Sequence, residues 1–189
     1  MAKFGRVINK LLKNEGVRFG KNGKPIKGKT GYGNHPRDKG KETNYGITIA
    51  VARRNGYRGP MRDIPFAEVL RIYKLRYWDK LRCSDIPDQT IANEMFDGAA
   101  NCGPRTMGRF LQRALNLFNK EEVKYADLVV DGKVGKKTIR TLKRALSMAW
   151  WVRIATFRAI NALRRRRYIR LAEEQKRYET FIGGWLMRD

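Results

Sequence analysis

The first fifteen residues carry an apolar stripe with helical spacing. The apolar positions follow the i, i+3, i+4, i+7, i+8 rule of an amphipathic helix: Phe4, Val7, Ile8, Leu11 and Leu12. The next position on the stripe is Glu15, and Gly16 follows it as a residue typical of helix C-caps. The pattern therefore predicts a short helix whose buried face ends in a carboxylic acid. Partial burial and the negative end of the helix dipole both favour a protonated carboxyl group there.

The next stretch loses this periodicity. Residues 18–41 are rich in Gly, Lys and Arg and contain two prolines, which predicts a loop or a short twisted hairpin. Order returns at Thr43–Thr48, and Thr48 can N-cap a short helix that runs through Arg54 and ends near Gly56. A long irregular segment inside a compact domain is often functional.

The rest of the chain predicts helices. Apolar residues recur with helical period in four segments: 66–78, 91–99, 107–118 and 138–179. Breaks fall at Ile86-Pro87-Asp88, at Gly103-Pro104 and at the turn Val129–Gly135, and Gly183-Gly184-Trp185 should be a docked tail. The fold class is therefore mainly α, a helical bundle with a small loop- and hairpin-rich lobe near the N-terminus.

Charge changes the picture of the partners. The chain has 189 residues and 42% hydrophobic content, which suits one domain or one domain with an appendage. Forty-two Lys and Arg against 18 Asp and Glu give a net charge of +24. Such a charge attracts polyanions, and both nucleic acid and an anionic bacterial envelope qualify. We interpret the basic run Arg164–Arg167 as a solvated face.

Few residues are available for metal or nucleophilic chemistry. Cys83 and Cys102 form no CxxC motif, so we interpret them as two buried free thiols, with one disulfide as the alternative. His35 is the single histidine, whereas zinc hydrolases usually take two or three His ligands. We therefore expect no metal and no cofactor, and no His-based nucleophile unless His35 supplies it. No secretory signal and no membrane span are visible in the sequence.

Carboxylates remain as the reagents. Hydrolysis of a glycosidic bond needs a protonated acid at the leaving oxygen and a second group on the other face of the sugar. Glu15 fits the first role because of its place on the helix. Candidates for the second role are Asp38, Glu42, Glu94 and Asp97.

Several motifs now form a set. Glu15-Gly16, Asp38-Lys39-Gly40 and Thr43–Thr48 resemble the opening of phage N-acetylmuramidases of glycoside hydrolase family 108, which reads E-G-G, D-x-G-G and T-N-x-G-I-T. Later residues are similar to further motifs of that family and of its associated peptidoglycan-binding half: Ile72-Tyr73, Tyr77-Trp78-Asp79, Phe96-Asp97, Asn101, Gly103, Leu111-Gln112, Asp131-Gly132, Gly135, Thr138, Gly184-Trp185 and Arg188.

The resemblance implies an α+β lysozyme-like fold, with a muramidase region at 1–103 and a peptidoglycan-binding region at 104–189 packed on it as one compact unit. It implies cleavage of the β-1,4 bond from N-acetylmuramic acid to N-acetylglucosamine. Glu15 would protonate the leaving oxygen while Asp38 and Thr43 hold a water on the opposite face, with inversion at the anomeric carbon. Substrate-binding residues would then be the following: Asn44, Tyr45, Asp97 and Asn101.

The sequence also departs from the family pattern. Val17 and Lys41 replace the second Gly of two motifs, and the loop from Glu15 to Asp38 is longer than expected. Glu42 or Asp97 therefore stays an alternative for the second catalytic role.

Other functions remain open at this point. The alternatives are a basic nucleic-acid-binding phage protein, a wall-binding protein without catalysis, and a lytic transglycosylase. For a muramidase we expect a monomer that binds peptidoglycan, is attracted to anionic lipopolysaccharide, and binds nucleic acid only non-specifically. It would stay in the host cytoplasm until release to the cell wall, or be carried in a virion.

Overall fold

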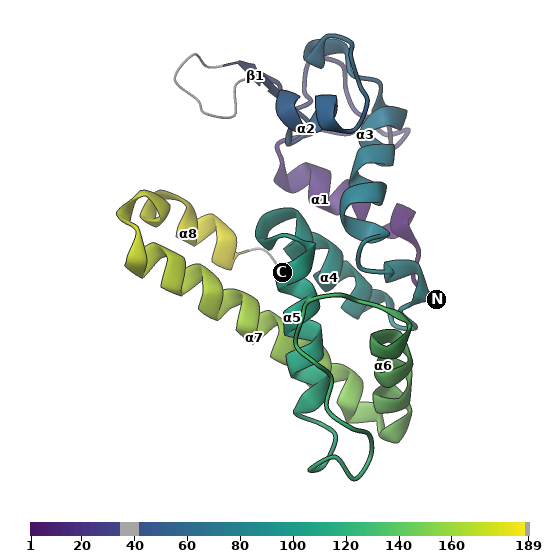
Figure 1. Cartoon of the computed structure of the whole chain (residues 1–189). Helices are drawn as coiled ribbons and strands as arrows, with labels where there is room; N and C mark the ends of the chain where they lie inside the picture. The colour runs from purple at the N-terminus through teal and green to yellow at the C-terminus, as the bar shows by residue number, and fades with distance from the viewer. Residues whose placement is uncertain (35–41, 188–189) are drawn as a thin grey trace. The chain divides into compact units, whose positions relative to one another are not determined.

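The computed structural model describes residues 1–34 and 42–187, and the chain forms two compact units (Figure 1). We call Lys3–Trp78 the N-terminal unit, and Met1–Ala2 with Asp79–Asp189 the C-terminal unit. This division by packing falls after Trp78, whereas the predicted regions divide after residue 103. The physical reason is that the helix after residue 88 packs on the helices that follow it.

The N-terminal unit combines short helices with a small sheet. Its elements are η1 (Phe4–Arg6), α1 (Ile8–Asn14), β1 (Gly33–Asn34), β2 (Glu42–Asn44), β3 (Ile47–Thr48), α2 (Ile49–Arg54), η2 (Met61–Asp63), α3 (Phe66–Tyr73) and the π-helical turn η3 (Lys74–Trp78). The strands are antiparallel in the order β1-β2-β3, with Thr43 opposite both Gly33 and Thr48. The predicted hairpin-rich lobe is confirmed.

Helix α1 has the predicted buried stripe, and it ends at the predicted place. Its C-cap is Glu15, and Gly16 follows in the left-handed region at φ +83°. The Gly16 N–H donates to the Lys13 carbonyl and the Val17 N–H to the Leu12 carbonyl, both at 3.0 Å. These two bonds form the Schellman arrangement, which satisfies carbonyls left open at a helix end. Glu15 is therefore held by a defined backbone turn.

Strands β2 and β3 are joined by a two-residue turn. Tyr45 and Gly46 both have positive φ, at 53° and 72°, which is the backbone of a type I′ hairpin turn. Thr48 then accepts a hydrogen bond from the Val51 N–H at 3.4 Å and caps α2, as predicted. The stretch 43–48 is thus a hairpin that leads directly into a helix.

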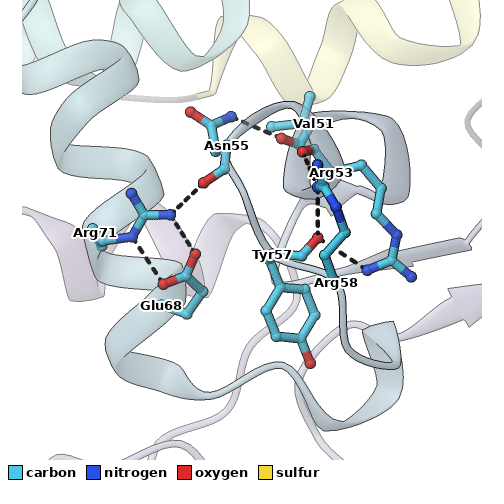
Figure 2. Close-up of polar contacts among 7 residues, drawn as sticks. All are labelled: Val51, Arg53, Asn55, Tyr57, Arg58, Glu68 and Arg71. Carbon is cyan, nitrogen blue, oxygen red and sulfur yellow. Dashed lines mark hydrogen bonds and ion pairs between the residues drawn. The ribbon is translucent and has the colours of Figure 1, made fainter.

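The connection from α2 to α3 is fixed by side chains that bind backbone carbonyls (Figure 2). Arg71 on α3 pairs with Glu68 one turn earlier, its Nε lying 2.8 Å from Glu68 Oε2, and also donates to the Asn55 carbonyl after α2. The Asn55 amide donates to the Val51 carbonyl at 2.7 Å, and Arg53 donates to the Tyr57 carbonyl at 3.1 Å. The bond from Arg71 to Asn55 holds the last turn of α3, the helix that ends at Tyr73, against the end of α2.

Within the residues that the structure describes, the regular elements of the C-terminal unit are all helices, and an irregular segment, 117–135, joins two of them. Its elements are η4 (Cys83–Asp85), α4 (Gln89–Cys102), α5 (Pro104–Asn116), α6 (Lys136–Met148), α7 (Trp150–Glu174), η5 (Lys176–Tyr178) and α8 (Glu179–Leu186). Helices α4, α5 and α7 pack on one another, and α8 turns back along α7 (Figure 1). Trp185 on α8 packs against Tyr168, as expected of a docked tail. No helix in the described part of the chain is long and apolar enough to span a membrane.

The single helix predicted from Thr138 to about Glu179 is wrong. Ala149 has extended backbone angles, φ −164° and ψ 152°, and separates α6 from α7. A second break at Gln175 separates α7 from η5 and α8. The break at Ala149 lets both α6 and α7 pack on α5, which one straight helix of that length would not do. No Gly or Pro marks the position in the sequence.

The interpretation of Arg164–Arg167 as a solvated face is wrong at its first residue. Arg164 is 1% exposed, and it lies 3.0 Å from a Glu94 oxygen and 2.8 Å from an Asp97 oxygen. A buried guanidinium needs such partners because an unpaired charge in the interior is very costly. Elsewhere in this unit both cysteines are free thiols, Cys83 buried and Cys102 half-buried.

Candidate active site

Glu15 meets the hairpin turn and the end of α3. A Cβ atom built on Gly46 would lie 2.8 Å from Glu15 Cγ, 2.9 Å from Glu15 Oε2 and 2.8 Å from the Tyr73 hydroxyl. The carboxyl group of Glu15 and the phenol of Tyr73 therefore share the space directly against the Gly46 backbone. Glu15 is half-buried. The two ends of the stretch 15–48 thus come together.

Backbone contacts hold the turn beside Glu15. The Tyr73 hydroxyl donates to the Tyr45 carbonyl at 2.9 Å, and the Tyr45 N–H donates to the Thr30 carbonyl at 3.0 Å. On the other side, a Cβ on Gly31 would lie 2.6 Å from the Glu15 carbonyl oxygen. The loop before β1 and the end of α3 therefore enclose both the cap of α1 and the turn. This arrangement is suited to holding one carboxyl group in a fixed position.

The predicted second group is only partly described. Asp38 lies outside the described residues, and so does His35. Thr43 is half-buried on β2, on the same hairpin as Gly46. Glu42 is also half-buried and accepts a hydrogen bond from the Tyr32 hydroxyl at 3.0 Å.

Asn44 and Tyr45 were predicted to bind substrate, and both side chains are buried. Asn44 is 0% exposed, and its amide nitrogen donates to the Met61 carbonyl at 2.8 Å. Tyr45 is 7% exposed and its ring lies 5.9 Å from that of Phe66. Burial also raises the pKa of the Tyr45 phenol. In this structure both side chains anchor the hairpin to the N-terminal unit.

Asp97 and Asn101 belong to the C-terminal unit. The Asp97 carboxylate is paired with Arg164, and the Asn101 amide donates to the Asp97 carbonyl at 3.1 Å. Asn101 is exposed and Asp97 is half-buried. The Arg164 pair gives Asp97 a part in holding α4 on α7.

Two residues of the site were missed as functional from the sequence. Gly46 provides the surface against which Glu15 lies, and Tyr73 supplies the hydroxyl beside it. Both occur within the motifs quoted above, as parts of T-N-x-G-I-T and of Ile72-Tyr73. The motif was the available signal, because the apolar stripe of α3 alone predicts Tyr73 as a core residue.

The residues that resemble the peptidoglycan-binding motif, Leu111-Gln112 and Asp131-Gly132, are joined by hydrogen bonds in the C-terminal unit. Gln112 is 2% exposed; its amide donates to Asp131 Oδ1 at 2.8 Å and its oxygen accepts from the Gly132 N–H at 2.7 Å. A Cβ on Gly108 would lie 2.2 Å from the Gly132 carbonyl oxygen, so the turn packs directly on α5. The motif therefore explains packing, by fixing the turn before α6.

The chemistry of the N-terminal site is that of a positioned carboxyl group. Within residues 1–34 and 42–187, no group of three His, Cys, Asp or Glu side chains is arranged to hold a metal ion. Glycosidic cleavage needs a carboxylic acid at the leaving oxygen, and Glu15 is the carboxyl group beside the Gly46 turn.

The site and the fold together are those of a helical glycoside hydrolase with a second helical unit. A family model described as "Glycosyl hydrolase 108" matches residues 8–103, and the chain belongs to this family. A second model, described as "Predicted Peptidoglycan domain", matches residues 106–189. The chain is accordingly a peptidoglycan hydrolase, and the resemblance found in its sequence is confirmed.

Among solved structures, the following is similar over nearly the whole chain. "Structure of Brucella abortus SagA" matches with a TM-score of 0.66 and 22% sequence identity, covering 98% of this chain and 88% of that chain. At this identity the match supports the fold, and the predicted mainly α, lysozyme-like class is confirmed. No curated protein matches the chain.

Proposed function

We propose that the chain is a muramidase that cleaves the β-1,4 bond between N-acetylmuramic acid and N-acetylglucosamine, with Glu15 as the general acid. The observation that carries this proposal is the position of Glu15, half-buried at a fixed helix end and against Gly46 and the Tyr73 hydroxyl. The family membership supports glycosidic cleavage.

The second role would fall to a water held on the opposite face of the sugar. We assign that water to Asp38 and Thr43, so that Glu15 protonates the leaving oxygen while the water attacks the anomeric carbon. Such an arrangement inverts the configuration, and it requires roughly 6.5–9.5 Å between the two carboxyl groups. Glu42 is the alternative, because it is half-buried on the same strand as Thr43. Asp97 is less favoured since Arg164 already pairs with it.

Tyr73 would act as a positioning residue. Its hydroxyl donates to the Tyr45 carbonyl, so it holds the turn against which Glu15 lies.

The direct test is the substitution Glu15→Gln. We expect the variant to fold normally and to lose lysis of outer-membrane-stripped cells by at least about a hundredfold, because the amide cannot donate the proton. Glu121→Gln is the matched control, since it removes an exposed carboxylate from a loop of the other unit and should leave lysis unchanged. Circular dichroism and thermal unfolding check the fold of both. Full activity of Glu15→Gln would exclude Glu15 as the acid.

The same assay decides the second group. Asp38→Asn and Glu42→Gln are compared, and the larger loss of activity identifies the carboxylate that guides the water. Mass spectrometry of the released muropeptides separates hydrolysis from transglycosylation, because hydrolysis leaves reducing ends and transglycosylation leaves anhydro sugars. Tight DNA binding at physiological salt with no lysis would favour the non-catalytic alternative. Release from the host cytoplasm, or carriage in a virion, stays a prediction.

A further inference from the structure

The C-terminal unit has a pocket whose lining is dominated by arginine. The pocket has a volume of about 240 Å³ and lies between α5 and α7. Its lining residues are Phe110 and Arg113 from α5, and Leu163, Arg166, Arg167 and Arg170 from α7. Among the described residues, no Asp or Glu lines it.

Helix geometry explains how the arginines gather. Leu163, Arg166, Arg167 and Arg170 have the spacing i, i+3, i+4, i+7, so they lie on one face of α7. Phe110 and Arg113 are likewise three residues apart on α5. Arg164, the first residue of the basic run, is instead turned inward to Glu94 and Asp97. Within the basic run, Arg164 is therefore paired inside the unit, whereas Arg166 and Arg167 line the pocket.

The charges in this pocket lack strong internal partners. Arg170 forms an ion pair with Glu174 at 3.3 Å, but both side chains are more than half exposed, so water screens the pair. Arg167 is half-buried, and its Nε is a buried donor without a hydrogen-bond partner in the part of the chain that the structure describes. Arg113 and Arg166 are exposed. Guanidinium groups gathered in this way repel one another, and an anion in the pocket would relieve that repulsion.

The shape and lining of the pocket restrict the ligand. The planar guanidinium fork matches carboxylate and phosphate groups. Phe110 is 8% exposed and Leu163 is half-buried, so the apolar part of the lining is small. It suits the methyl and methylene groups of a short peptide, whereas the acyl chains of a phosphorylated glycolipid would need a much larger apolar surface. All six lining residues fall within the match to the peptidoglycan domain.

We propose that this arginine pocket binds carboxylate groups of the peptide stems of peptidoglycan. Those stems present free carboxylates next to methyl and methylene groups. The arginines of the pocket can pair with the carboxylates, and Phe110 and Leu163 can pack against the apolar groups. The proposal rests on the wall-hydrolase function only for the identity of the ligand. It gives the C-terminal unit a recognition role that is independent of Glu15.

The test measures binding of a soluble probe, N-acetylglucosaminyl-N-acetylmuramyl tetrapeptide, by calorimetry. The probe lacks the bond proposed for cleavage, so its binding is independent of catalysis and of the outcome for Glu15→Gln. The comparison ligand is the same probe with its carboxyl groups converted to amides. We expect amidation to weaken binding by about tenfold or more, because it removes the charge that the guanidinium groups pair with.

Two double variants separate the pocket from the general charge. Arg113→Gln with Arg166→Gln should weaken probe binding by about tenfold, whereas Arg140→Gln with Arg158→Gln should change it by less than about twofold. All four arginines are exposed, and the last two lie on α6 and α7 outside the pocket. Thermal unfolding confirms the fold, and Arg166→Gln alone replaces the first pair if that pair unfolds.

Three results would overturn the proposal. One is equal affinity for the carboxylate and amide probes, and another is an equal loss of binding in the two double variants. The third is pocket-dependent binding of vesicles containing a phosphorylated lipid that is tighter than binding of the muropeptide. Loss of probe binding in the pocket variant supports the pocket, and loss of lysis in Glu15→Gln supports the acid. The two results are independent of each other.

Discussion

At the scale of single residues, the proposed acid lies against a backbone position that only glycine fits. Gly46 has φ +72°, and the space that its Cβ would occupy is taken by Glu15 and by the Tyr73 hydroxyl. Gly23 has the same φ of +72°, but nothing lies within 4 Å of its Cβ position. At both glycines a side chain would therefore meet the same unfavourable left-handed backbone. Only at Gly46 would it also displace other side chains.

This pair allows a clean comparison. Gly46→Ala and Gly23→Ala should each lose about 1–2 kcal/mol of unfolding free energy from the left-handed conformation. Gly46→Ala should also lower cell-wall lysis by about ten- to hundredfold, since small displacements of a catalytic group are expensive. Gly23→Ala should keep nearly full activity. Denaturant unfolding and a turbidity assay measure the two effects, and equal activities of the two variants would contradict the placement of Glu15 against Gly46.

The sequence predicted the residues of this site unequally. Glu15 and the hairpin residues could be predicted from the sequence because helical spacing and turn preferences depend on neighbouring residues. Tyr73 was not assigned a function, since its hydroxyl reaches the Tyr45 carbonyl only after the chain has folded back over 28 residues. The same holds for Arg164, whose partner Asp97 lies 67 residues away. Composition and spacing carry no information about which long-range partner a buried side chain finds.

At the scale of elements, local signals predicted most helix ends and failed where packing alone decides. Thr48 accepts a capping hydrogen bond from Val51 where the sequence predicts a cap, and Asp88, in a predicted break, accepts one from Ile91. Gly103 likewise separates α4 from α5, as predicted. Ala149 carries no such signal, and the helix breaks there because α6 and α7 both pack on α5.

The turn before α6 offers a pH test at this scale. The Gln112 amide and the Lys133 backbone N–H donate to Asp131 and hold the pKa of its carboxyl below the ordinary 3.8. A lowered folded pKa adds stability above the ordinary pKa, and this is lost as pH falls through the folded value. Asp131→Asn should therefore lower the melting temperature slightly near neutral pH, and the difference from wild type should close in acid below about pH 3.

The control for this experiment is Glu121→Gln, which removes an exposed carboxylate from the same unit. Thermal unfolding followed by circular dichroism from about pH 7 to about pH 2 gives the comparison. A difference between Asp131→Asn and wild type that stays constant over the whole range would rule out the proposed charge-assisted bonds of Asp131.

At the scale of the whole molecule, the net charge affects how fast the protein reaches its substrate, whereas the individual sites determine the reaction that follows. The net charge of +24 is the balance of 42 basic and 18 acidic residues, whereas the proposed acid depends on one carboxyl group. Long-range attraction to an anionic wall raises the rate at which the protein arrives there. It does not change the proton transfer from a carboxyl group already in contact with the sugar. Salt should therefore affect the two steps differently.

We expect the second-order rate of lysis, kcat/KM, to fall steeply as NaCl is raised from about 0.01 M to about 1 M, because the screening length shrinks from about 30 Å to about 3 Å. The turnover rate at saturating wall substrate should change by less than about twofold over the same range. Initial rates on outer-membrane-stripped cells at several substrate densities give both quantities. The variant Arg140→Gln with Arg158→Gln should show a shallower salt dependence and an unchanged kcat, since it removes two exposed charges away from both proposed sites. A salt-independent kcat/KM would mean that the large positive charge has no part in reaching the wall.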